Sequence, residues 1–403
     1  MMIEWQLTKL GEVCKVIAGQ SPEGKFYNEA GEGIPFYQGK KEFQEKYIGA
    51  PRIWTREVTK EAEAGDVLMS VRAPVGPVNF ATEKICIGRG LAAIRASHRL
   101  DRDFLFYFLL SKQAEISGNE GAVFASINKA QIEEIQLPLF PFPEQKRIVA
   151  ILDEALAGID TAAASAEKNL VNARELFDSY LNSIFTQKGE GWVRKKLEDT
   201  VEKTCSLSYG IVQPGEDVNG GLPIVRPTDL QSKIIYLNGL KRIDPALADG
   251  YRRTKLYGGE LLLCVRGGTG SISVAANELA GSNVTRGIVP IRFDPAVLIQ
   301  EFGYFAFSSK GLQDQIRAAT YGAALMQINI RDLRKVFLDL PPLDVQGNLL
   351  EKLANISAEV ERLASIYEQK AAALAGLKQA ILQKAFAGEL AAQPEKPVQE
   401  AAE

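Results

Sequence analysis

The sequence has very few of the residues on which most enzyme and metal sites depend. Its single histidine, His98, lies in a polar stretch and is expected at the surface, which excludes a multi-histidine metal site and disfavours histidine-based catalysis. The four cysteines are far apart and never form a C-x-x-C pair, so we expect buried thiols and neither a disulfide framework nor a thiolate zinc site. They are Cys14, Cys86, Cys205 and Cys264.

Long apolar runs and an excess of one charge are also absent. The longest apolar runs, such as residues 104–110, are far shorter than the roughly 20 residues that span a bilayer. The first residues lack the basic-then-apolar shape of a signal peptide, so we expect a cytoplasmic protein. With 47 basic and 50 acidic residues the net charge is −3, and bulk charge therefore gives no reason to expect a nucleic-acid partner.

What the chain does contain is a tandem repeat. At 403 residues, of which 46% are hydrophobic and 24% charged, it is long enough for two or three globular domains. Residues 65–72 (GDVLMSVR) return as residues 259–266 (GELLLCVR). The shift between matched positions grows from 187 near the start to 201 after Ile127, as expected when the second copy carries about 14 extra loop residues.

Each copy ends in a long predicted helix. Apolar residues recur at steps of three and four through residues 144–188, and the same pattern recurs through residues 344–390 with its skip at the same point. This spacing is the seam of a coiled coil, and neither range contains a proline. Each helix would be roughly 65 Å long and would need a partner for its apolar stripe. If a pseudo-twofold axis relates the copies, the helices pair antiparallel.

Further apolar residues lie off the main stripe of the first helix. A stripe this wide indicates more than one neighbour, so these residues are candidates for a partner-binding face. The alternative is that the helices serve only as a spacer. The candidates are Ile151, Leu156, Leu176, Leu181 and Phe185.

The remaining segments predict two mixed globular domains, residues 1–143 and 189–343, and a disordered tail, residues 391–403. The second domain has 19 basic against 16 acidic residues and the first is balanced, so the helices and tail carry the acidity. The predicted fold class is α+β, with two α/β domains related by a pseudo-twofold axis and separated by two long antiparallel coiled-coil helices.

Within each predicted domain the same elements are expected at matched positions. Apolar runs closely preceded by glycine predict buried strands at 67–71 and 261–265. Helices are expected at 103–116 and 298–316.

No motif for catalysis emerges from the chain. The phosphate-binding signature G-x-x-x-x-G-K-[ST] does not occur, and the glycine-rich residues 266–271 lack the following lysine. Residues 339–343 (DLPPL) have a faint likeness to the D-P-P-Y motif of adenine methyltransferases, but a leucine separates the acid from the prolines and no aromatic residue follows. We interpret them as a linker.

A duplicated unit of about 200 residues, each a globular domain followed by a long helix, resembles the DNA-specificity subunit of type I restriction-modification systems. The motifs that carry the resemblance are the start at 5–11 (WQLTKLG), the strand at 65–72, and the junction at 137–149 (LPLFPFPEQKRIV). The second junction, 338–346 (LDLPPLDVQ), keeps the glutamine but departs from the P-E-Q-K-R pattern.

The resemblance implies a division of labour. Each globular domain would be a target recognition domain that reads one half of a bipartite, asymmetric site in double-stranded DNA. The helices would act as a ruler for the spacer and as the dock for two methyltransferase subunits, which carry S-adenosylmethionine and modify adenine at N6. The resemblance also implies an ATP-dependent restriction subunit as a partner of that assembly. The chain itself would bind no cofactor and would not be an enzyme.

Two alternatives remain at this point. The first is a non-enzymatic coiled-coil scaffold whose globular domains bind proteins. The second is a DNA-modifying enzyme, which needs a catalytic motif that the sequence does not show.

Candidate DNA-contacting residues lie at the ends of repeated strands and in loops that differ between the copies. Arginine can pair with the edge of guanine and glutamine with that of adenine. Positions that differ are the better candidates for base readout, because a residue shared by two readers of different sequences is better suited to hold phosphate or the fold. The full set is Gln38, Lys40, Lys41, Arg72 and Arg89 in the first copy, and Arg226, Thr228, Arg266, Thr269 and Arg286 in the second.

Two asparagines at equivalent positions, Asn128 and Asn329, are predicted to cap the short helices that follow them.

Overall fold

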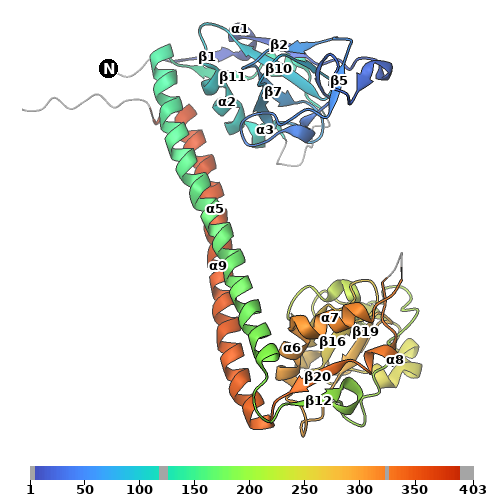
Figure 1. The fold of residues 1–403 in the computed structure, drawn as a ribbon. Coiled ribbons are helices and arrows are strands. Elements are labelled where there is room, and N and C mark those ends of the chain that lie inside the picture. Colours follow the sequence, from blue (N-terminus) through green and yellow to red (C-terminus); the bar gives the residue numbers. More distant parts are fainter. Residues whose placement is uncertain (1–4, 118–125, 323–325, 391–403) are drawn as a thin grey trace, which may run out of the picture. The chain divides into compact units, whose positions relative to one another are not determined.

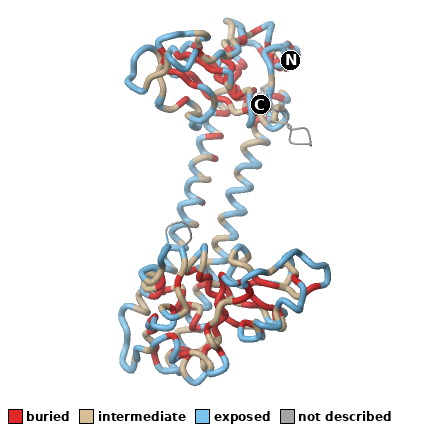
Figure 2. The backbone as a smooth tube through the Cα atoms, turned by 90° about the vertical axis from the view of Figure 1, so that its right-hand side faces the viewer, coloured by how far each residue is buried: buried red, intermediate tan, exposed pale blue. Residues whose placement is uncertain are grey.

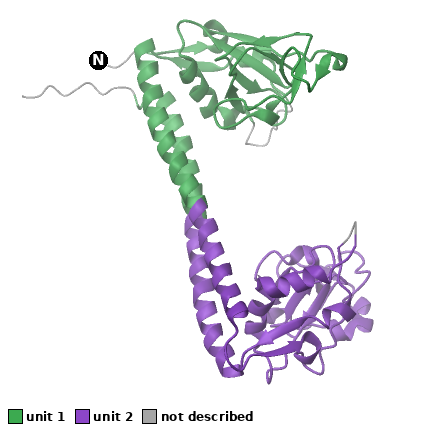
Figure 3. Ribbon diagram, viewed as in Figure 1, with its two compact units in different colours: residues 1–167, 368–403 green, residues 168–367 purple. Residues whose placement is uncertain are grey.

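The computed structural model describes residues 5–117, 126–322 and 326–390 (Figure 1). The tail expected to be disordered, 391–403, lies outside these residues. The chain divides into two compact units (Figure 3). Unit 1 contains residues 1–167 and 368–403, and unit 2 contains residues 168–367. Each unit therefore combines one globular domain with a segment of each long helix.

The two long helices are α5 (Phe142–Gln187) and α9 (Leu343–Phe386), close to the ranges that the apolar spacing predicts. Prolines lie at their starts, where the missing N–H is tolerated. α9 ends two residues before Gly388, whose φ of +83° is the left-handed conformation that commonly follows a helix.

Within unit 1 the segments of the two long helices run antiparallel. Lys378 Nζ lies 2.8 Å from Asp160 Oδ1, and Arg147, more than three turns earlier in α5, donates to the carbonyl oxygen of Leu390, which follows α9. Later positions in one helix thus pair with earlier positions in the other. The antiparallel pairing that the repeat predicts is present in this unit.

In the globular domain of unit 1, the described residues form three sheets and four short helices. The four-stranded antiparallel sheet has the order β2 (Cys14–Ala18), β10 (Leu91–Ala96), β7 (Val67–Ser70), β8 (Val78–Phe80). The five-stranded sheet has the order β3 (Tyr27–Asn28), β5 (Ile53–Thr55), β4 (Ile34–Tyr37), β9 (Ile85–Ile87), β6 (Glu61–Ala62). A third sheet pairs β1 (Gln6–Lys9) with β11 (Gln136–Leu139), and the helices are α1 (Leu10–Val13), α2 (Arg102–Ser111), α3 (Gln113–Ile116) and α4 (Lys129–Glu133).

The globular domain of unit 2 repeats this plan with local changes. Its four-stranded sheet has the order β14 (Ile234–Ile235), β17 (Ile272–Ala275), β16 (Leu261–Cys264), β19 (Ile288–Ile291). A three-stranded sheet has the order β15 (Lys241–Ile243), β13 (Leu222–Val225), β18 (Asn283–Val284), and a further pair joins β12 (Val193–Lys196) to β20 (Phe337–Leu340). The helices are α6 (Gln300–Ser308), α7 (Lys310–Ala318) and α8 (Ile330–Leu333).

Short 3-10 helices complete both domains. They are η1 (Gly24–Phe26) and η2 (Lys40–Glu42) in unit 1, and η3 (Leu197–Asp199), η4 (Pro227–Asp229), η5 (Pro245–Thr254) and η6 (Asn277–Leu279) in unit 2.

The central strands form where the sequence predicts them, and every residue of β7 and of β16 is buried. The predicted helices at 103–116 and 298–316 are instead each divided in two, because the chain turns at Lys112 and at Ser309. The core of each unit also takes in both long helices, which are buried on the side that meets the domain (Figure 2). The helices are thus part of two domain cores.

A buried acid next to an arginine recurs beside the central strand of each unit. Asp66 is 3% exposed and accepts hydrogen bonds from Nε and Nη2 of Arg95, both at 2.8 Å. At the matching position Glu260 is fully buried, lies 3.7 Å from Nη1 of Arg292, and accepts from the backbone N–H of Tyr257 at 2.6 Å. The acidic residue of the repeated G-[DE] pair is therefore buried in both units. Burying a carboxylate costs free energy, and the nearby arginine and the backbone N–H groups offset that cost.

The scarce residues lie as the sequence predicts. Cys86, Cys205 and Cys264 are buried, Cys14 is half-buried, and all four are free thiols. His98 is exposed. Within the described residues no helix combines the length and apolar character that crossing a bilayer requires.

Candidate nucleic-acid interface

Four segments of unit 1 meet at one edge of the domain, which we call loop edge 1: residues 37–41, 71–72, 88–90 and 126–127. β4 and β9 are parallel, so the loops that follow them leave the sheet at the same end, and Gly88 N donates to Tyr37 O at 2.8 Å. The end of β7 joins them because Val71 N donates to Gly90 O at 2.9 Å. Ile127 N in turn donates to Val71 O at 3.0 Å.

Unit 2 builds the same frame, which we call loop edge 2: residues 225–229, 265–269, 285–287 and 326–328. Thr285 N donates to Val225 O at 2.9 Å, and Val265 N donates to Gly287 O at 2.7 Å. The last bond is also repeated, since Ile328 N donates to Val265 O at 3.0 Å. Three backbone hydrogen bonds thus recur at matched positions in both units.

The glycines of the two repeated R-G pairs, residues 89–90 and 286–287, are required by close packing at these edges. A side chain at Gly90 would begin 2.4 Å from the carbonyl oxygen of Gln38, and one at Gly287 would begin 2.5 Å from Cγ of Pro227. Neither approach leaves room for a Cβ atom. Glycine at these two positions lets neighbouring loops pack closely and places the preceding arginine at the rim.

All five predicted DNA-contacting residues of the first copy lie on loop edge 1. Gln38, Arg72 and Arg89 are exposed and come from three different segments of the edge. Gln38 is oriented by a hydrogen bond from Ser21 Oγ to its Oε1 at 2.8 Å, and Ser21 Oγ also accepts from the backbone N–H of Arg89 at 3.3 Å. Lys40 and Lys41 are exposed on η2, directly after Gln38.

The five predicted residues of the second copy lie on loop edge 2, but they are held differently. Arg226 is half-buried, and its Nη2 and Nε donate to Oδ1 and Oδ2 of Asp229 at 2.8 and 3.1 Å. Thr269 Oγ1 donates to the carbonyl oxygen of Met326 at 3.0 Å. Thr228 and Arg286 are exposed, and Arg266 is half-buried.

Most cations of the two edges have no acidic partner. Within residues 5–117, 126–322 and 326–390, no carboxylate forms an ion pair with any of six of these side chains. An unpaired cation at a rim keeps its full charge available to a phosphate or a base edge. The six are Lys40, Lys41, Arg72, Arg89, Arg266 and Arg286.

Loop edge 2 also presents residues that the sequence patterns did not single out. Tyr321 and Gln327 pair through both backbone hydrogen bonds at 2.9 Å, and Gln327 forms a bridge with Arg266. Tyr321 is 44% exposed, as is Met326 beside it. Tyr321, Gln327 and Met326 belong to no repeated block or recognised motif of the sequence, so only the folded structure reveals their place at this edge.

The two asparagines predicted to cap helices behave differently. Asn128 caps α4 with a capping box, in which its Oδ1 accepts from Gln131 N at 3.0 Å and its own N–H donates to Gln131 Oε1 at 2.9 Å. Asn329 stands at the N-cap of α8, but its Oδ1 accepts from the hydroxyl of Tyr321 at 2.6 Å and makes no cap bond. The prediction is therefore confirmed for Asn128 and wrong for Asn329. The Asn329 side chain bonds to the Tyr321 hydroxyl instead, and among the described residues no tyrosine competes in this way for Asn128.

The structure corrects part of the predicted partner-binding face. Leu156 is 4% exposed and Leu181 is 1% exposed, because each packs into the core of its own unit. Ile151 is half-buried. Leu176 is 71% exposed and is the one candidate of the five that lies fully at the surface.

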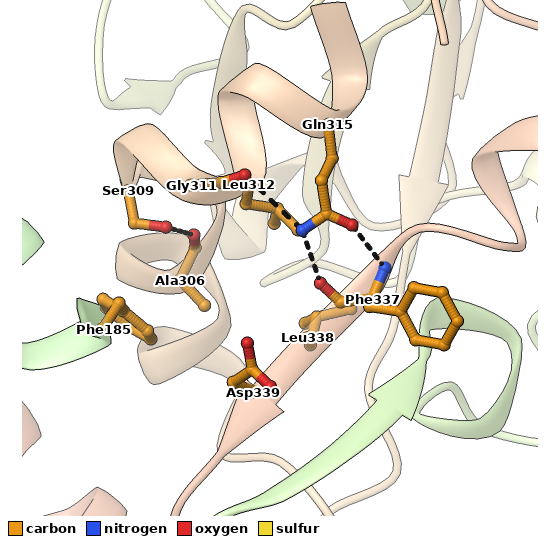
Figure 4. A pocket seen from close by; sticks show the side chains of 9 residues that line it. All are labelled: Phe185, Ala306, Ser309, Gly311, Leu312, Gln315, Phe337, Leu338 and Asp339. Carbon is orange, nitrogen blue, oxygen red and sulfur yellow. Dashed lines mark hydrogen bonds between the residues drawn. The ribbon is translucent and has the colours of Figure 1, made fainter. Parts of the chain in front are cut away.

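Phe185, the last candidate, lies at the wall of a pocket in unit 2 (Figure 4). Its ring centroid is 5.6 Å from that of Phe302 and 6.0 Å from that of Trp192. Across the pocket, Gln315 bonds to both backbone groups of Phe337, at 3.0 and 2.9 Å. With a volume of about 80 Å³, the pocket is far below the roughly 300 Å³ of a small-molecule site. Phe185 therefore ties α5 to its neighbouring domain.

In the described part of the chain, no cluster of three or more His, Cys, Asp or Glu side chains has the geometry of a metal site. Burial raises the pKa of the Cys14 thiol to about 12 and also raises the pKa of Cys264, so neither thiol is activated as a nucleophile. The feature that recurs in both units is a loop edge held by the same three backbone hydrogen bonds.

Comparison with known proteins finds relatives for this repeat. Residues 2–170 match the type I restriction modification DNA specificity domain, a span that covers the first globular domain and the first part of α5. A type I restriction enzyme MjaX specificity subunit of Methanocaldococcus jannaschii is 40% identical over 190 residues, which are 46% of this chain and 43% of that relative. The EcoBI specificity subunit of Escherichia coli is 23% identical over 395 residues, 87% of this chain and 82% of its own. Over these spans the chain is similar to type I restriction enzyme specificity subunits.

Solved structures show the same fold as this chain. A chain from a study of complex assembly and conformational transition of the type I R-M system aligns with a TM-score of 0.75 and 21% identity, over 97% of this chain and 100% of that chain. The HsdS subunit from Thermoanaerobacter tengcongensis aligns with a TM-score of 0.55 and 20% identity, over 96% and 97% of the two chains. The match to the MjaX subunit spans less than half of that relative's length.

Proposed function

We propose that this chain is the DNA-recognition subunit of a type I restriction-modification complex and that each loop edge reads one half of a bipartite, asymmetric site in double-stranded DNA. The observation that carries the proposal is the repeated backbone frame with different side chains. Loop edge 1 presents Gln38, Lys40 and Lys41 where loop edge 2 presents Arg226 and Thr228. Two readers built on one frame with different polar tips are suited to two different short sequences.

The charge of the edges supports both parts of such binding. Arg72 and Arg266 occupy matched positions, as do Arg89 and Arg286, so we assign these four to phosphate contacts that position each domain. Gln38, Lys40, Lys41, Arg226, Thr228 and Thr269 are assigned to base edges, where a good bidentate pair is worth about 1–3 kcal/mol of discrimination. Two linked readers multiply their specificity.

The long helices are proposed to dock two methyltransferase subunits that carry S-adenosylmethionine, with an ATP-dependent restriction subunit as a further partner of that assembly. Support comes from apolar side chains that the helices leave exposed. They include Leu176 at 71%, and Val171, Ile366 and Leu377, each between 43% and 48% exposed. Methyltransferase partners would also supply phosphate contacts that a chain of net charge −3 needs. The chain itself then catalyses nothing, binds no cofactor, and works in the cytoplasm with its DNA.

The test is to map methylated adenines in the genome of a host that expresses this chain with a type I methyltransferase subunit. We expect one bipartite motif with a fixed spacer. Exchanging residues 37–41 for those of a relative should change one half of the motif and leave the other half intact. Methylation that is unaffected by the presence of this chain would overturn the proposal. Capture of a protein ligand by the globular domains, with no shift of DNA mobility, would favour the scaffold alternative.

A further inference from the structure

Each globular domain is fastened to its long helix at a buried glutamine in the first turn. Gln145 is fully buried, and its Oε1 accepts from Asp101 N at 2.7 Å while its Nε2 donates to the carbonyl oxygens of Arg99 at 3.0 Å and Phe140 at 2.8 Å. One side chain thus joins the start of α5, the segment before α2, and the end of β11. Both amide hydrogens and the carbonyl oxygen of Gln145 therefore have partners.

Unit 2 repeats this fastening atom for atom. Gln346 is also fully buried, and its Oε1 accepts from Ile299 N at 2.9 Å. Its Nε2 donates to the carbonyl oxygens of Val297 at 3.0 Å and Pro341 at 2.9 Å. The glutamine is the one polar residue that the two junction sequences share, although the residues around it differ.

A lysine provides a second fastening further along the helix. Lys46 Nζ lies 3.1 Å from Asp153 of α5 and 3.2 Å from Asp103, and it passes over the ring of Tyr107 at 5.0 Å. Burial by itself lowers the pKa of Lys46, but the hydrogen bonds to Asp153 and Asp103 and the nearby Tyr107 hydroxyl outweigh it, and the pKa is raised. The ammonium group is therefore held in its charged form on the helix.

The corresponding lysine in unit 2 is Lys233, which lies beside β17 as Lys46 lies beside β8. Its Nζ lies 3.5 Å from Ser357 Oγ and 3.6 Å from Glu361, both on α9, and 5.6 Å from the ring centroid of Tyr304. Both lysines are fixed at the backbone as well, since their carbonyl oxygens accept from Phe80 N at 2.9 Å and from Val274 N at 2.8 Å.

Two points of attachment on one helix fix the angle between the globular domain and that helix, whereas one point of attachment would let the domain swivel. Asp153 follows Gln145 by eight residues, so the two points of unit 1 are about 12 Å apart, and holding the second to about 1 Å limits a swivel of the domain to about 5°. One extra base pair in a spacer turns the next half-site by about 34° and moves it by about 3.4 Å. A domain that swivels freely could follow that turn, whereas a fixed one cannot.

We propose that Gln145 and Gln346, together with Lys46 and Lys233, are positioning residues that set the angle between each domain and its long helix, and that this angle restricts the spacer length that the subunit accepts. The proposal rests on the proposed function, because a spacer exists only for a bipartite site. These side chains touch no DNA in this assignment. They act on specificity through the orientation of the loop edges.

The experiment compares spacer lengths among methylated sites, using the full chain expressed with its methyltransferase partner. Lys46→Met removes the charge and keeps the stem over Tyr107, and Gln145→Leu removes all three hydrogen bonds of the first fastening. We expect both variants to keep the half-site sequences, while methylation at spacers one base pair longer or shorter rises about tenfold relative to the original spacer. Lys46→Arg should restore the original distribution.

Lys84→Met is the matched control, because it removes an ion pair with Glu61 at 2.8 Å that stays within the domain. It should leave the spacer distribution unchanged. A purely structural role of Lys46 would lower methylation at all sites equally, and an unchanged distribution in Lys46→Met would overturn the inference even if Gln145→Leu does not fold. If the unaltered complex methylates no bipartite site, it is the proposed function that fails.

Discussion

Arg226 and Asp229 form a two-pronged ion pair at loop edge 2, with the guanidinium of the one facing the carboxylate of the other at 2.8 and 3.1 Å. Asp229 also accepts from the backbone N–H of Arg226 at 2.7 Å, and its hydrogen bonding raises the pKa of the guanidinium further above its ordinary value. The pair orients Arg226 before any ligand arrives. A preformed fork of this kind is the side chain best suited to a guanine edge.

The first prediction concerns this orientation. Asp229→Ala should free the guanidinium of Arg226 and reduce discrimination at one position of the second half-site by about tenfold, while the first half-site stays as it was. Adenine methylation mapping measures both halves at once. Asp314→Ala, which removes an exposed acid on α7 of the same unit, is the control and should change neither. Equal loss at both half-sites would contradict the assignment of Arg226.

A second prediction addresses the buried acid of unit 1. Asp66→Ala leaves Arg95 without its main partner and the backbone N–H of Glu63 without its acceptor, so the local free energy of unfolding should fall by about 3 kcal/mol. Native-state hydrogen exchange at β7 and β10 measures this. Glu61→Ala, which breaks an exposed pair with Lys84, should cost less than about 1 kcal/mol. Similar costs for the two substitutions would show that burial of Asp66 does not matter.

The two asparagines give a third prediction. Asn128→Ala removes the capping box of α4 and should destabilise that helix by about 1 kcal/mol, seen as faster hydrogen exchange in its first turn. Asn329→Ala should leave α8 nearly unchanged, since its side chain makes no cap bond there. Its effect should appear at Tyr321, whose hydroxyl loses an acceptor, and therefore in recognition of the second half-site. Equal effects on the two helices would contradict this difference.

A fourth prediction tests the long helices as a ruler. Both helices run through both units, so an insertion must be made in each, after Glu167 in α5 and after Tyr367 in α9. Four residues add about 6 Å and close to one turn, which should change the accepted spacer by one or two base pairs and keep both half-sites. Two residues should turn the apolar seam off its partner and abolish assembly. An unchanged spacer after the four-residue insertions would leave the helices as a docking surface only.

The fifth prediction is that the purified chain, given DNA and S-adenosylmethionine, transfers no methyl group. The sequence contains no cofactor motif, and His98 is exposed, away from both loop edges in sequence. Incorporation of labelled methyl groups into DNA is the measurement, with the reconstituted complex as the positive control. Transfer by the chain alone would return the DNA-modifying enzyme to consideration.

Periodicity and repetition were sufficient to predict the two long helices and the central strand of each domain. Steps of three and four predicted α5 and α9, and a matched apolar block predicted β7 and β16, because these patterns follow directly from the geometry of a helix and a buried strand. The division of each shorter helix at Lys112 and Ser309 was not predicted. Both stretches keep helical composition through the turn, which tertiary packing alone decides.

The structure brings the ten polar residues that the sequence singled out to the two loop edges, because the ends of repeated strands and the variable loops meet there. Their contact with DNA stays a prediction, and Tyr321 and Gln327 were not predicted. The bond between Arg226 and Asp229 links residues only three apart, yet nothing in their types distinguishes it from a chance pair. Gln145 and Lys46 were missed because their partners are far away in the chain, and no local pattern encodes a contact over 44 or 107 positions.

The sharing of both helices between the units sets an order of assembly during synthesis. Phe386, near the end of α9, lies with its ring 5.1 Å from that of Phe104 and 5.5 Å from that of Phe108, so it completes the core of the first domain. A ribosome makes Phe104 about 280 residues before Phe386. Unit 2 is complete in sequence at residue 367. The domain that is translated first is therefore completed last. Part of its apolar core stays exposed, and accessible to a chaperone, through most of the synthesis of the chain.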